Sequence, residues 1–398
     1  WSSAAGVAGA VALAYFLGLR LEPELFAEEG ISLFRPASGI GAGIMIAARG
    51  PQRVSVAAGI LLATAGASFL DGQSLGLALF GGLCNAGEAA LAAYLIGRWS
   101  GAGFDPASIP RIMGFLAAAG LAAAAAATGW TVAAGVDGAG ASLLEVWWRS
   151  FLASGVGIAT IAPPLIEARR LLAQPPPRGT LIEGTAALAM LIGASAYVFA
   201  LSDDTWLRLV PVTLLLPMLL WITARYPPVF GAAGLVIVVL AILCSATFGV
   251  GRFGASGIPL SDRVLAVQVT ALTLAVSMLV LNGLFAERRD REARLESSRQ
   301  HLTDRNERLR LALDGASLGA FAVEFVTQRF EANARAAFIH GHLRVPDTLK
   351  EGRCYIQRED KQRIDAHYMR AQQAPGPWST EYRVVPPPGH PLAGHVRW

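Results

Sequence analysis

The chain has 398 residues, of which 54% are hydrophobic and 16% are charged, and its mean hydropathy is +0.46. This composition argues against an ordinary soluble enzyme and indicates a membrane protein. Arginines beside membrane spans explain the formal net charge of +4, so nucleic acid is not expected as a partner. Charged residues are sparse up to residue 284 and dense after it, which predicts a lipid-embedded part followed by a water-exposed part.

Ten apolar runs follow one another through the first part, each close to the roughly 20 residues that a helix needs to cross a bilayer. They cover residues 3–19, 31–48, 54–70, 75–96, 112–134, 143–166, 181–201, 206–224, 229–250 and 264–285. The sequence therefore predicts a polytopic α-helical membrane bundle of about ten spans, with the lipid bilayer as its first partner.

Arginine is concentrated in alternate loops between these runs. One set of loops contains Arg49, Arg53, Arg98, Arg111, Arg169, Arg170, Arg178, Arg225, Arg288 and Arg289. The other set is poorer in arginine, with Arg20, Arg252 and Arg263 as exceptions, and contains the acids Glu22, Glu24, Glu28, Glu29, Asp71, Asp137, Asp203 and Asp204. Because cytoplasmic loops are enriched in Lys and Arg, the pattern predicts that both ends of the chain are cytoplasmic.

Five polar side chains in or near the spans are candidates for ligand binding or switching, namely Arg35, Asn85, Glu88, Glu145 and Arg149. An ionised side chain in mid-span costs roughly 2.5 to 3.5 kcal/mol, so such residues usually face the bundle interior. Asn85 and Glu88 lie three apart and share a helix face. Glu145 and Arg149 are four apart, a spacing that permits an ion pair.

Two interpretations of these five residues stay open. They form either a polar pocket that binds a small ligand or a proton, or a structural network of interhelical hydrogen bonds. For Glu145 and Arg149, near an outer interface beside Trp147 and Trp148, the sequence favours the structural interpretation.

Proline interrupts two of the runs. Pro36 with Gly39 predicts either a broken helix whose backbone groups can meet a ligand, or a simple kink. Pro163 and Pro164 stand shortly before a pair of arginines, which favours an ordinary span terminus.

A charged segment at residues 286–310 follows the last run, with Leu295, Leu302 and Leu309 spaced by sevens. One apolar residue per heptad is half of a coiled-coil seam. We expect a cytoplasmic signalling helix that pairs two protomers; the alternative is a solvated helix of a monomer.

From residue 311 the pattern is mixed. It predicts strands at 320–325, 379–385 and 394–398 and helices at 331–338 and 359–371, with a turn at Pro386-Pro387-Pro388-Gly389. A small α+β domain is therefore expected over residues 311–398.

No metal or cofactor is expected. Cys84, Cys244 and Cys354 have no CxxC or other ligand spacing, and all six His residues follow residue 300, which excludes a membrane haem held by paired His ligands.

Three segments of the first part resemble the MASE-type integral sensor domain of bacterial signalling proteins. They are Phe34-Arg35-Pro36-Ala37-Ser38-Gly39-Ile40 ending in Ala48-Arg49-Gly50, then Asn85-Ala86-Gly87-Glu88-Ala89, and then Trp147-Trp148 followed by Gly157 and Ala162-Pro163. Arg35 and Ser154 depart from this pattern, because the family usually has Trp at the first position and often Asp at the second. The resemblance implies a sensor domain over residues 1–285 in a bacterial inner membrane.

The last part resembles a PAS domain. The similar segments are Leu311-Ala312-Leu313 through Gly319-Ala320-Phe321, Ile356-Gln357-Arg358-Glu359-Asp360, and Glu381-Tyr382-Arg383-Val384 with Val396-Arg397-Trp398. Phe321 stands where that family usually has Trp, and the last strand is missing, so the domain looks truncated.

Together these features predict the sensory input region of a bacterial signal-transduction protein, responding to an unidentified small molecule or membrane stimulus. The family resemblance favours a histidine kinase as output beyond Trp398, although no catalytic motif lies within the chain. The alternatives are a diguanylate cyclase or phosphodiesterase as output, and a membrane transporter with a regulatory tail.

Overall fold

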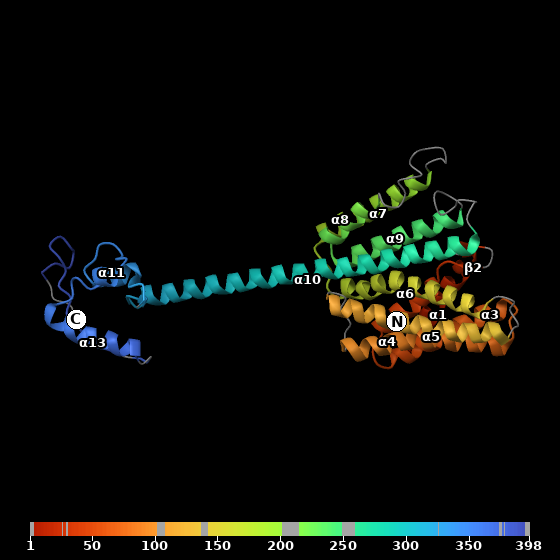
Figure 1. The fold of residues 1–398 in the computed structure, drawn as a ribbon, viewed down its shortest axis with the longest axis horizontal. Coiled ribbons are helices and arrows are strands. Elements are labelled where there is room, and N and C mark those ends of the chain that lie inside the picture. The colour runs from red at the N-terminus through yellow and green to blue at the C-terminus, as the bar shows by residue number, and fades with distance from the viewer. Residues whose placement is uncertain are drawn as a thin grey trace. The chain divides into compact units, whose positions relative to one another are not determined.

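The computed structural model describes residues 4–25, 27–28, 31–101, 108–136, 142–200, 215–248, 259–324, 326–373, 376–377 and 379–394. The chain divides into two compact units, Trp1–Arg291 and Glu292–Trp398 (Figure 1). Each unit is described by itself below.

The first unit is a bundle of helices with one two-stranded hairpin. Its helices are α1 (Ala4–Leu25), α2 (Pro36–Ala47), α3 (Gln52–Leu70), α4 (Leu75–Ser100), α5 (Ile109–Val136), α6 (Leu143–Ala173), α7 (Arg178–Ala200), α8 (Leu215–Arg225), α9 (Pro228–Thr247) and the bundle part of α10 (Leu260–Gly315). The antiparallel strands β1 (Ala27–Glu28) and β2 (Ile31–Ser32) lie between α1 and α2.

Eight helices in the described part of the chain are long and apolar enough to cross a membrane. Two of the ten predicted runs contain shorter helices in the residues that the structure describes. The 12 residues of α2 rise only about 18 Å, against the roughly 30 Å of a bilayer core. Helix α8 begins at Leu215, and residues 206–214 of its predicted run lie outside the described residues.

The short helices preserve the alternation of chain direction. Arg169 of α6 donates to the carbonyl oxygen of Ala47, so α2 and α6 end at the same face of the bundle. Thr247 Oγ1 donates to the carbonyl oxygen of Leu25 at 3.2 Å, which places the ends of α9 and α1 together. Of the loop residues used to predict orientation, Glu29, Asp137, Asp203, Asp204 and Arg252 lie outside the described residues.

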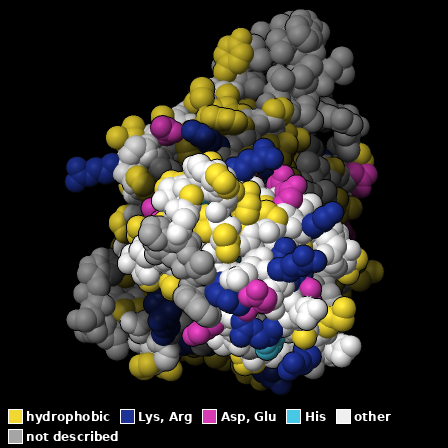
Figure 2. All heavy atoms as spheres, turned by 90° about the vertical axis from the view of Figure 1, so that its left-hand side faces the viewer, with side chains coloured by type: hydrophobic (Ala, Val, Ile, Leu, Met, Phe, Trp, Pro, Cys, Tyr) yellow, Lys and Arg dark blue, Asp and Glu magenta, His cyan; other side chains and the backbone are white. Residues whose placement is uncertain are grey.

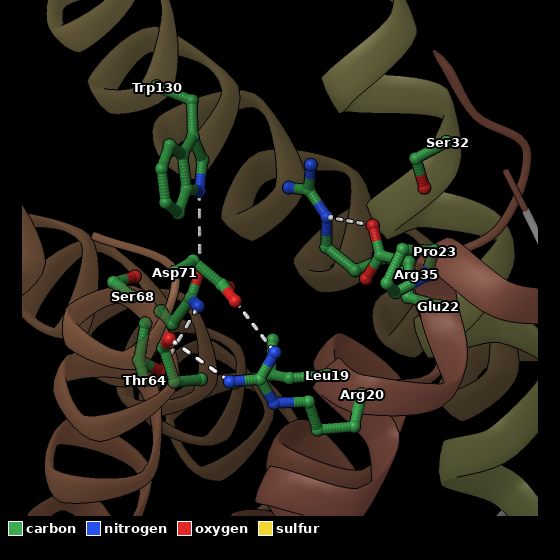
Figure 3. A pocket seen from close by; sticks show the side chains of 12 residues that line it. Leu19, Arg20, Glu22, Pro23, Ser32, Arg35, Thr64, Ser68, Asp71 and Trp130 are labelled. Atoms are coloured by element: carbon green, nitrogen blue, oxygen red, sulfur yellow. Dashed lines mark hydrogen bonds and ion pairs between the residues drawn. The ribbon is translucent and has the colours of Figure 1, made fainter. Parts of the chain in front are cut away.

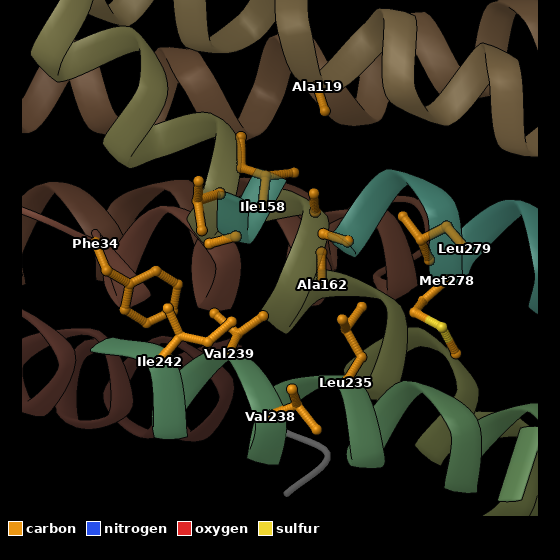
Figure 4. Packing of buried hydrophobic residues seen from close by; sticks show 14 of the residues in the cluster. Phe34, Ala119, Ile158, Ala162, Leu235, Val238, Val239, Ile242, Met278 and Leu279 are labelled. Carbon is orange, nitrogen blue, oxygen red and sulfur yellow. The ribbon is translucent and has the colours of Figure 1, made fainter. Parts of the chain in front are cut away.

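Helix α6 is the central helix of the bundle. Its buried Ile158 and Ala162 pack in one cluster with Phe34, with Leu235 and Val239 of α9 and with Met278 of α10 (Figure 4). Pro163 and Pro164 lie inside this helix, which continues to Ala173, so the predicted span terminus at these prolines is wrong.

Small residues allow α2 and α6 to approach closely. A Cβ atom added to Gly39 would lie 2.2 Å from the carbonyl oxygen of Gly157, and one added to Gly157 would lie 2.1 Å from that of Arg35. In lipid, where hydrophobicity does not drive helices together, such backbone contact is a main source of packing energy. It fixes the start of α2 against the middle of α6.

Helix α10 is one continuous helix over Leu260–Gly315, so the predicted last span and the predicted charged helix are a single element. On its charged part, Leu295, Leu302 and Leu309 are exposed by 62%, 60% and 59%. Among the described residues, this apolar row on a charged helix is thus exposed.

The second unit contains a two-stranded antiparallel sheet, β3 (Phe321–Glu324) and β4 (Arg329–Ala332), and the helices α11 (Ala334–Ile339), α12 (Leu349–Gly352) and α13 (Arg358–Gln373). Basic and acidic side chains are interspersed on the face of the molecule drawn in Figure 2. Such a mixture is typical of a surface in water.

The predictions for this part are confirmed unevenly. The strand at 320–325 and the helix at 359–371 correspond to β3 and α13. The helix at 331–338 is wrong at its start, because residues up to Ala332 pair in β4 and Asn333 caps α11 through its side chain.

The strand predicted at 379–385 does not form; this segment has one isolated bridge, Ile356 with Val384. The backbone N–H of Arg383 donates to Asp360 Oδ2 at 2.9 Å rather than to a neighbouring strand. Residues 395–398 of the last predicted strand lie outside the described residues, and the PAS fold stays a prediction.

Candidate functional site

A cavity of about 400 Å³ lies in the bundle beside the β1–β2 hairpin (Figure 3). Its walls come from the end of α1, from β2, from the residue before α2, and from α3, α4 and α5. The lining residues are Leu19, Arg20, Glu22, Pro23, Ser32, Arg35, Thr64, Ala67, Ser68, Asp71, Asn85 and Trp130.

Arg35 reaches this cavity because the chain is not helical just before it. Leu33 and Phe34 are fully buried, and α2 begins at Pro36, whose missing N–H and fixed φ suit the first turn of a helix. The backbone N–H of Arg35 donates to the carbonyl oxygen of Ala153 at 3.3 Å. Irregular backbone at membrane depth is tolerated where protein surrounds it, as here. Pro36 thus starts α2, and neither a kink nor a helix that continues on both sides of Pro36 is present in this described segment.

Two ion pairs line the cavity. Arg20 Nη1 lies 2.7 Å from Asp71 Oδ1, and Arg35 Nε lies 3.5 Å from Glu22 Oε1. Figure 3 shows the two pairs on different sides of the open space. The Arg35 guanidinium also lies 5.8 Å from the centre of the Trp130 ring, within the range of a cation–π interaction.

A chain of hydrogen bonds runs from Arg35 to Glu88. Arg35 Nη1 donates to Ser154 Oγ at 3.5 Å, the hydroxyls of Ser154 and Ser38 are 3.3 Å apart, and Ser38 Oγ donates to Glu88 Oε2 at 2.8 Å. Either hydroxyl of Ser38 and Ser154 can be the donor in the middle contact. The two hydroxyls thus connect the guanidinium to the carboxylate.

Glu88 is itself closed off from the cavity, with 3% of its surface exposed. Ser38 lies in the first turn of α2, so the carboxylate faces the positive end of that helix. Its second oxygen, Oε1, is buried without a hydrogen-bond partner among the described residues. Glu88 is thus a buried acid connected to Arg35 through the hydroxyls of Ser38 and Ser154.

Asn85 is held by two neighbouring helices. Its Nδ2 donates to Thr64 Oγ1 of α3 at 3.3 Å, and its Oδ1 accepts from Trp130 Nε1 of α5 at 3.3 Å. Asn85 therefore connects α3, α4 and α5 at the cavity wall.

The cavity also touches α10. Ser32 lines the cavity, and its carbonyl oxygen accepts a hydrogen bond of 3.1 Å from Nε2 of Gln268, a fully buried residue of α10. This bond joins the cavity directly to the helix that leaves the bundle.

Three of the five residues singled out in the sequence, Arg35, Asn85 and Glu88, come together at this site. Glu145 and Arg149 do not; they form an ion pair within α6, with half-exposed side chains, and neither lines the cavity. The ion pair that their spacing permits is therefore present, and the interpretation of these two residues as structural rather than ligand-binding stays a prediction.

Sequence reasoning missed several lining residues. Glu22 and Asp71 were assigned only as loop acids, and Trp130 and Thr64 lie in apolar runs with no marked pattern. The available signal for Glu22 was its distance of thirteen residues from Arg35, which a hairpin can close.

The second unit has a separate polar cluster. Asp360 Oδ2 accepts hydrogen bonds from Nε of Arg383 at 3.0 Å and from its backbone N–H at 2.9 Å. These two bonds lower the pKa of Asp360 to about 2. Tyr382 OH lies 2.6 Å from His340 Nε2; burial lowers the pKa of His340 and raises that of Tyr382 to about 12. Among the described residues, no group of His, Cys, Asp and Glu is arranged to hold a metal ion.

Comparison with known proteins identifies the family. Residues 6–289 match the MASE1 family, and no curated protein or solved structure matches the chain. Since this match covers more than half of the chain, the protein belongs to the MASE1 family, whose members are membrane-associated sensory domains found in signalling proteins. The resemblance to MASE-type domains is thereby confirmed.

Proposed function

We propose that this chain is the ligand-sensing input region of a bacterial inner-membrane histidine kinase, and that its stimulus is a small molecule that binds in the cavity. The observation that carries the proposal is the bond from Gln268 of α10 to Ser32 at the cavity wall. A ligand that displaces Ser32 changes the packing of the one helix that extends from the bundle into the second unit.

Signalling requires that the ligand bind two states of the bundle with different affinities. The Arg35 relay provides such a difference, because a ligand that pairs with Arg35 weakens its contact with Ser154 and hence the support of Glu88. Ser32, at the end of β2, and Arg35, just before α2, belong to one short segment, so a ligand that moves either residue acts on the same piece of chain. The proposed switch is therefore the β2–α2 segment.

At the far end of the bundle part of α10, Arg289 holds the helix to α8. Its Nη1 donates to the carbonyl oxygen of Tyr226 at 2.7 Å and also contacts those of Thr223 and Ala224. These carbonyls end a helix and have no intrahelical donors, so the bonds are favourable. In the proposal, Arg289 fixes the position of α10 relative to α8 at the end of the bundle.

The charged part of α10 pairs two protomers in this proposal, through the exposed row of Leu295, Leu302 and Leu309. The second unit then acts as a PAS-like relay, which also contributes to the homodimer. With both ends of the chain cytoplasmic, as the arginine distribution predicts, this relay and the output module lie on the same side of the membrane.

The reading frame after Trp398 tests the output directly. A histidine-containing phosphorylation motif followed by an ATP-binding domain would support the kinase, whereas a GGDEF motif would assign a diguanylate cyclase to the same input region. A stop codon at that point would contradict both.

A transporter is the second candidate, favoured by one observation. Helix α2 is short and begins inside the bundle beside the buried Glu88, an arrangement that transporters use to bind substrates at broken helices. Uptake of a cavity ligand by vesicles that contain the protein would support this candidate, and binding without uptake would support the sensor.

A further inference from the structure

We propose that the cavity ligand is a small zwitterion, carrying one ammonium and one carboxylate group and about the size of an amino acid. This inference rests on the proposed sensor function and specifies the ligand of the same site.

The charges of the lining residues balance. Two guanidinium groups, Arg20 and Arg35, and two carboxylates, Glu22 and Asp71, face the cavity. A partly buried ion needs a compensating charge from its surroundings. This wall offers no net charge to a ligand of either sign, but it offers both signs to a ligand that carries both.

The Arg35–Glu22 pair is the part of the wall most ready to exchange partners. The distance of 3.5 Å between Arg35 Nε and Glu22 Oε1 is long for a charge-assisted hydrogen bond, which is normally about 2.7 to 2.9 Å. Both side chains are also largely buried, with exposed fractions of 15% for Arg35 and 14% for Glu22. A carboxylate on Arg35 and an ammonium on Glu22 would each form a shorter bond than the present one.

A purely anionic ligand meets two obstacles at the same place. Glu22 lies beside Arg35, and Glu88 is connected to Arg35 through Ser154 and Ser38. An anion on Arg35 is therefore close to two other acids. A purely cationic ligand is repelled by Arg35, whose guanidinium already lies over the face of the Trp130 ring.

The cavity size and its apolar parts fit the rest of such a ligand. A volume of about 400 Å³ is at the small end of ligand pockets, which run from roughly 300 to 1,000 Å³. Leu19, Pro23, Ala67 and Trp130 supply apolar contact for a short aliphatic or aromatic side chain.

Calorimetric titration of the full chain in lipid nanodiscs tests the proposal. The probes are the common L-amino acids, and each one that binds is compared with its amide, which lacks the carboxylate, and with its deaminated acid, which lacks the ammonium. We expect at least one amino acid to bind, and both of its analogues to bind at least about tenfold more weakly.

Substitutions locate the binding. Arg35→Gln and Glu22→Gln are each expected to weaken amino-acid binding by about tenfold or more, and Glu22→Gln is expected to narrow the gap between the amino acid and its deaminated acid. Arg149→Gln is the matched control, because Arg149 forms an exposed ion pair away from the cavity, and it should leave the affinity unchanged.

Failure of the whole panel to bind, or equal binding of an amino acid and its deaminated acid, would overturn the zwitterion. Binding of inorganic phosphate or a simple carboxylate that is lost in Arg35→Gln would also overturn it. That last result would leave the sensor proposal in place. The sensor proposal is tested by a separate measurement, and it fails if filling the cavity has no effect on α10.

Discussion

Nε2 of Gln268 lies 3.1 Å from the carbonyl oxygen of Ser32 and donates a hydrogen bond to it. The two residues are 236 positions apart in the chain, and Gln268 is fully buried. A buried side-chain amide is expensive to leave unpaired, so this hydrogen bond opposes movement of Ser32 away from α10. The cavity wall and α10 are thus joined by one hydrogen bond, which the proposed function uses to transmit the signal.

The exposed leucine row of α10 predicts contact between protomers. A cysteine at Leu302, in a background with the exposed Cys354 replaced by Ser, should form disulfide-linked dimers in native membranes under mild oxidation. Gln300→Cys is the control, since a shift of two residues turns the side chain about 160° away on a helix. Equal crosslinking at both positions, or none at Leu302, would argue against the paired helix.

The close contact of α2 and α6 predicts a strong effect of a single methyl group. Gly157→Ala places a Cβ atom 2.1 Å from the carbonyl oxygen of Arg35, and overpacking of this kind costs about 1 to 3 kcal/mol. The variant should unfold at a lower temperature in detergent and lose ligand binding.

The control on the same helix is Gly155→Ala, where an added Cβ atom would meet nothing within 4 Å. This variant should keep the unfolding temperature of the wild type. Similar losses in both variants would show that general helix effects, rather than the α2–α6 contact, account for the result.

The relay to Glu88 predicts different effects of two substitutions. Glu88→Ala leaves the buried hydroxyl of Ser38 without its acceptor, at a cost of about 1 to 3 kcal/mol. Glu88→Gln keeps an acceptor but removes the charge, so it should retain the fold, measured by thermal unfolding, and alter stimulus-dependent output. Glu145→Gln, in the ion pair away from the cavity, should change neither the unfolding temperature nor the output. Unchanged output in Glu88→Gln would remove Glu88 from the sensing site.

Much of the bundle was predictable because apolar runs and arginine-rich loops are local signals. The limit appears at residues 31–48, where an apolar run was read as a full span. Its first residues form β2 and the buried extended segment of Leu33 and Phe34, and only Pro36 onward is helical. Hydropathy does not distinguish a helix from an extended segment that protein surrounds.

Part of the site was predictable because ionisable residues in spans are costly and usually face inward. This argument identified Arg35, Asn85 and Glu88. It did not identify their partners, because Glu22, Ser38 and Trp130 become neighbours only through tertiary packing. Arg35 and Ser154, the two departures from the family pattern, contact each other at 3.5 Å, a relationship that sequence spacing does not contain.

The second unit carries a prediction about acid sensitivity. Asp360 has an ordinary pKa of 3.8, held at about 2 in the folded chain by bonds from Arg383. Because the folded pKa is the lower one, the unfolded state binds the proton more readily, and the stabilisation present above 3.8 is lost as the pH falls toward about 2.

Hydrogen exchange at the Arg383 amide, which donates to Asp360 Oδ2, measures this effect. After correction for the intrinsic exchange rate, protection in the wild type should fall over that pH window. Asp360→Asn should have weaker protection that does not change across it, and identical profiles for the two proteins would contradict the assignment.

The central claim, that occupancy of the cavity changes α10, is tested most directly by filling the cavity without a ligand. Ser68→Trp places an indole at the cavity wall, and Leu62→Trp places one on the exposed, lipid-facing side of the same helix. The rate of crosslinking at Leu302→Cys is measured in both variants, alone and with Gln268→Met. The account predicts a changed rate in Ser68→Trp, the wild-type rate in Leu62→Trp, and loss of the Ser68→Trp effect when Gln268→Met is added. The same crosslinking rate in Ser68→Trp as in the wild type would contradict it.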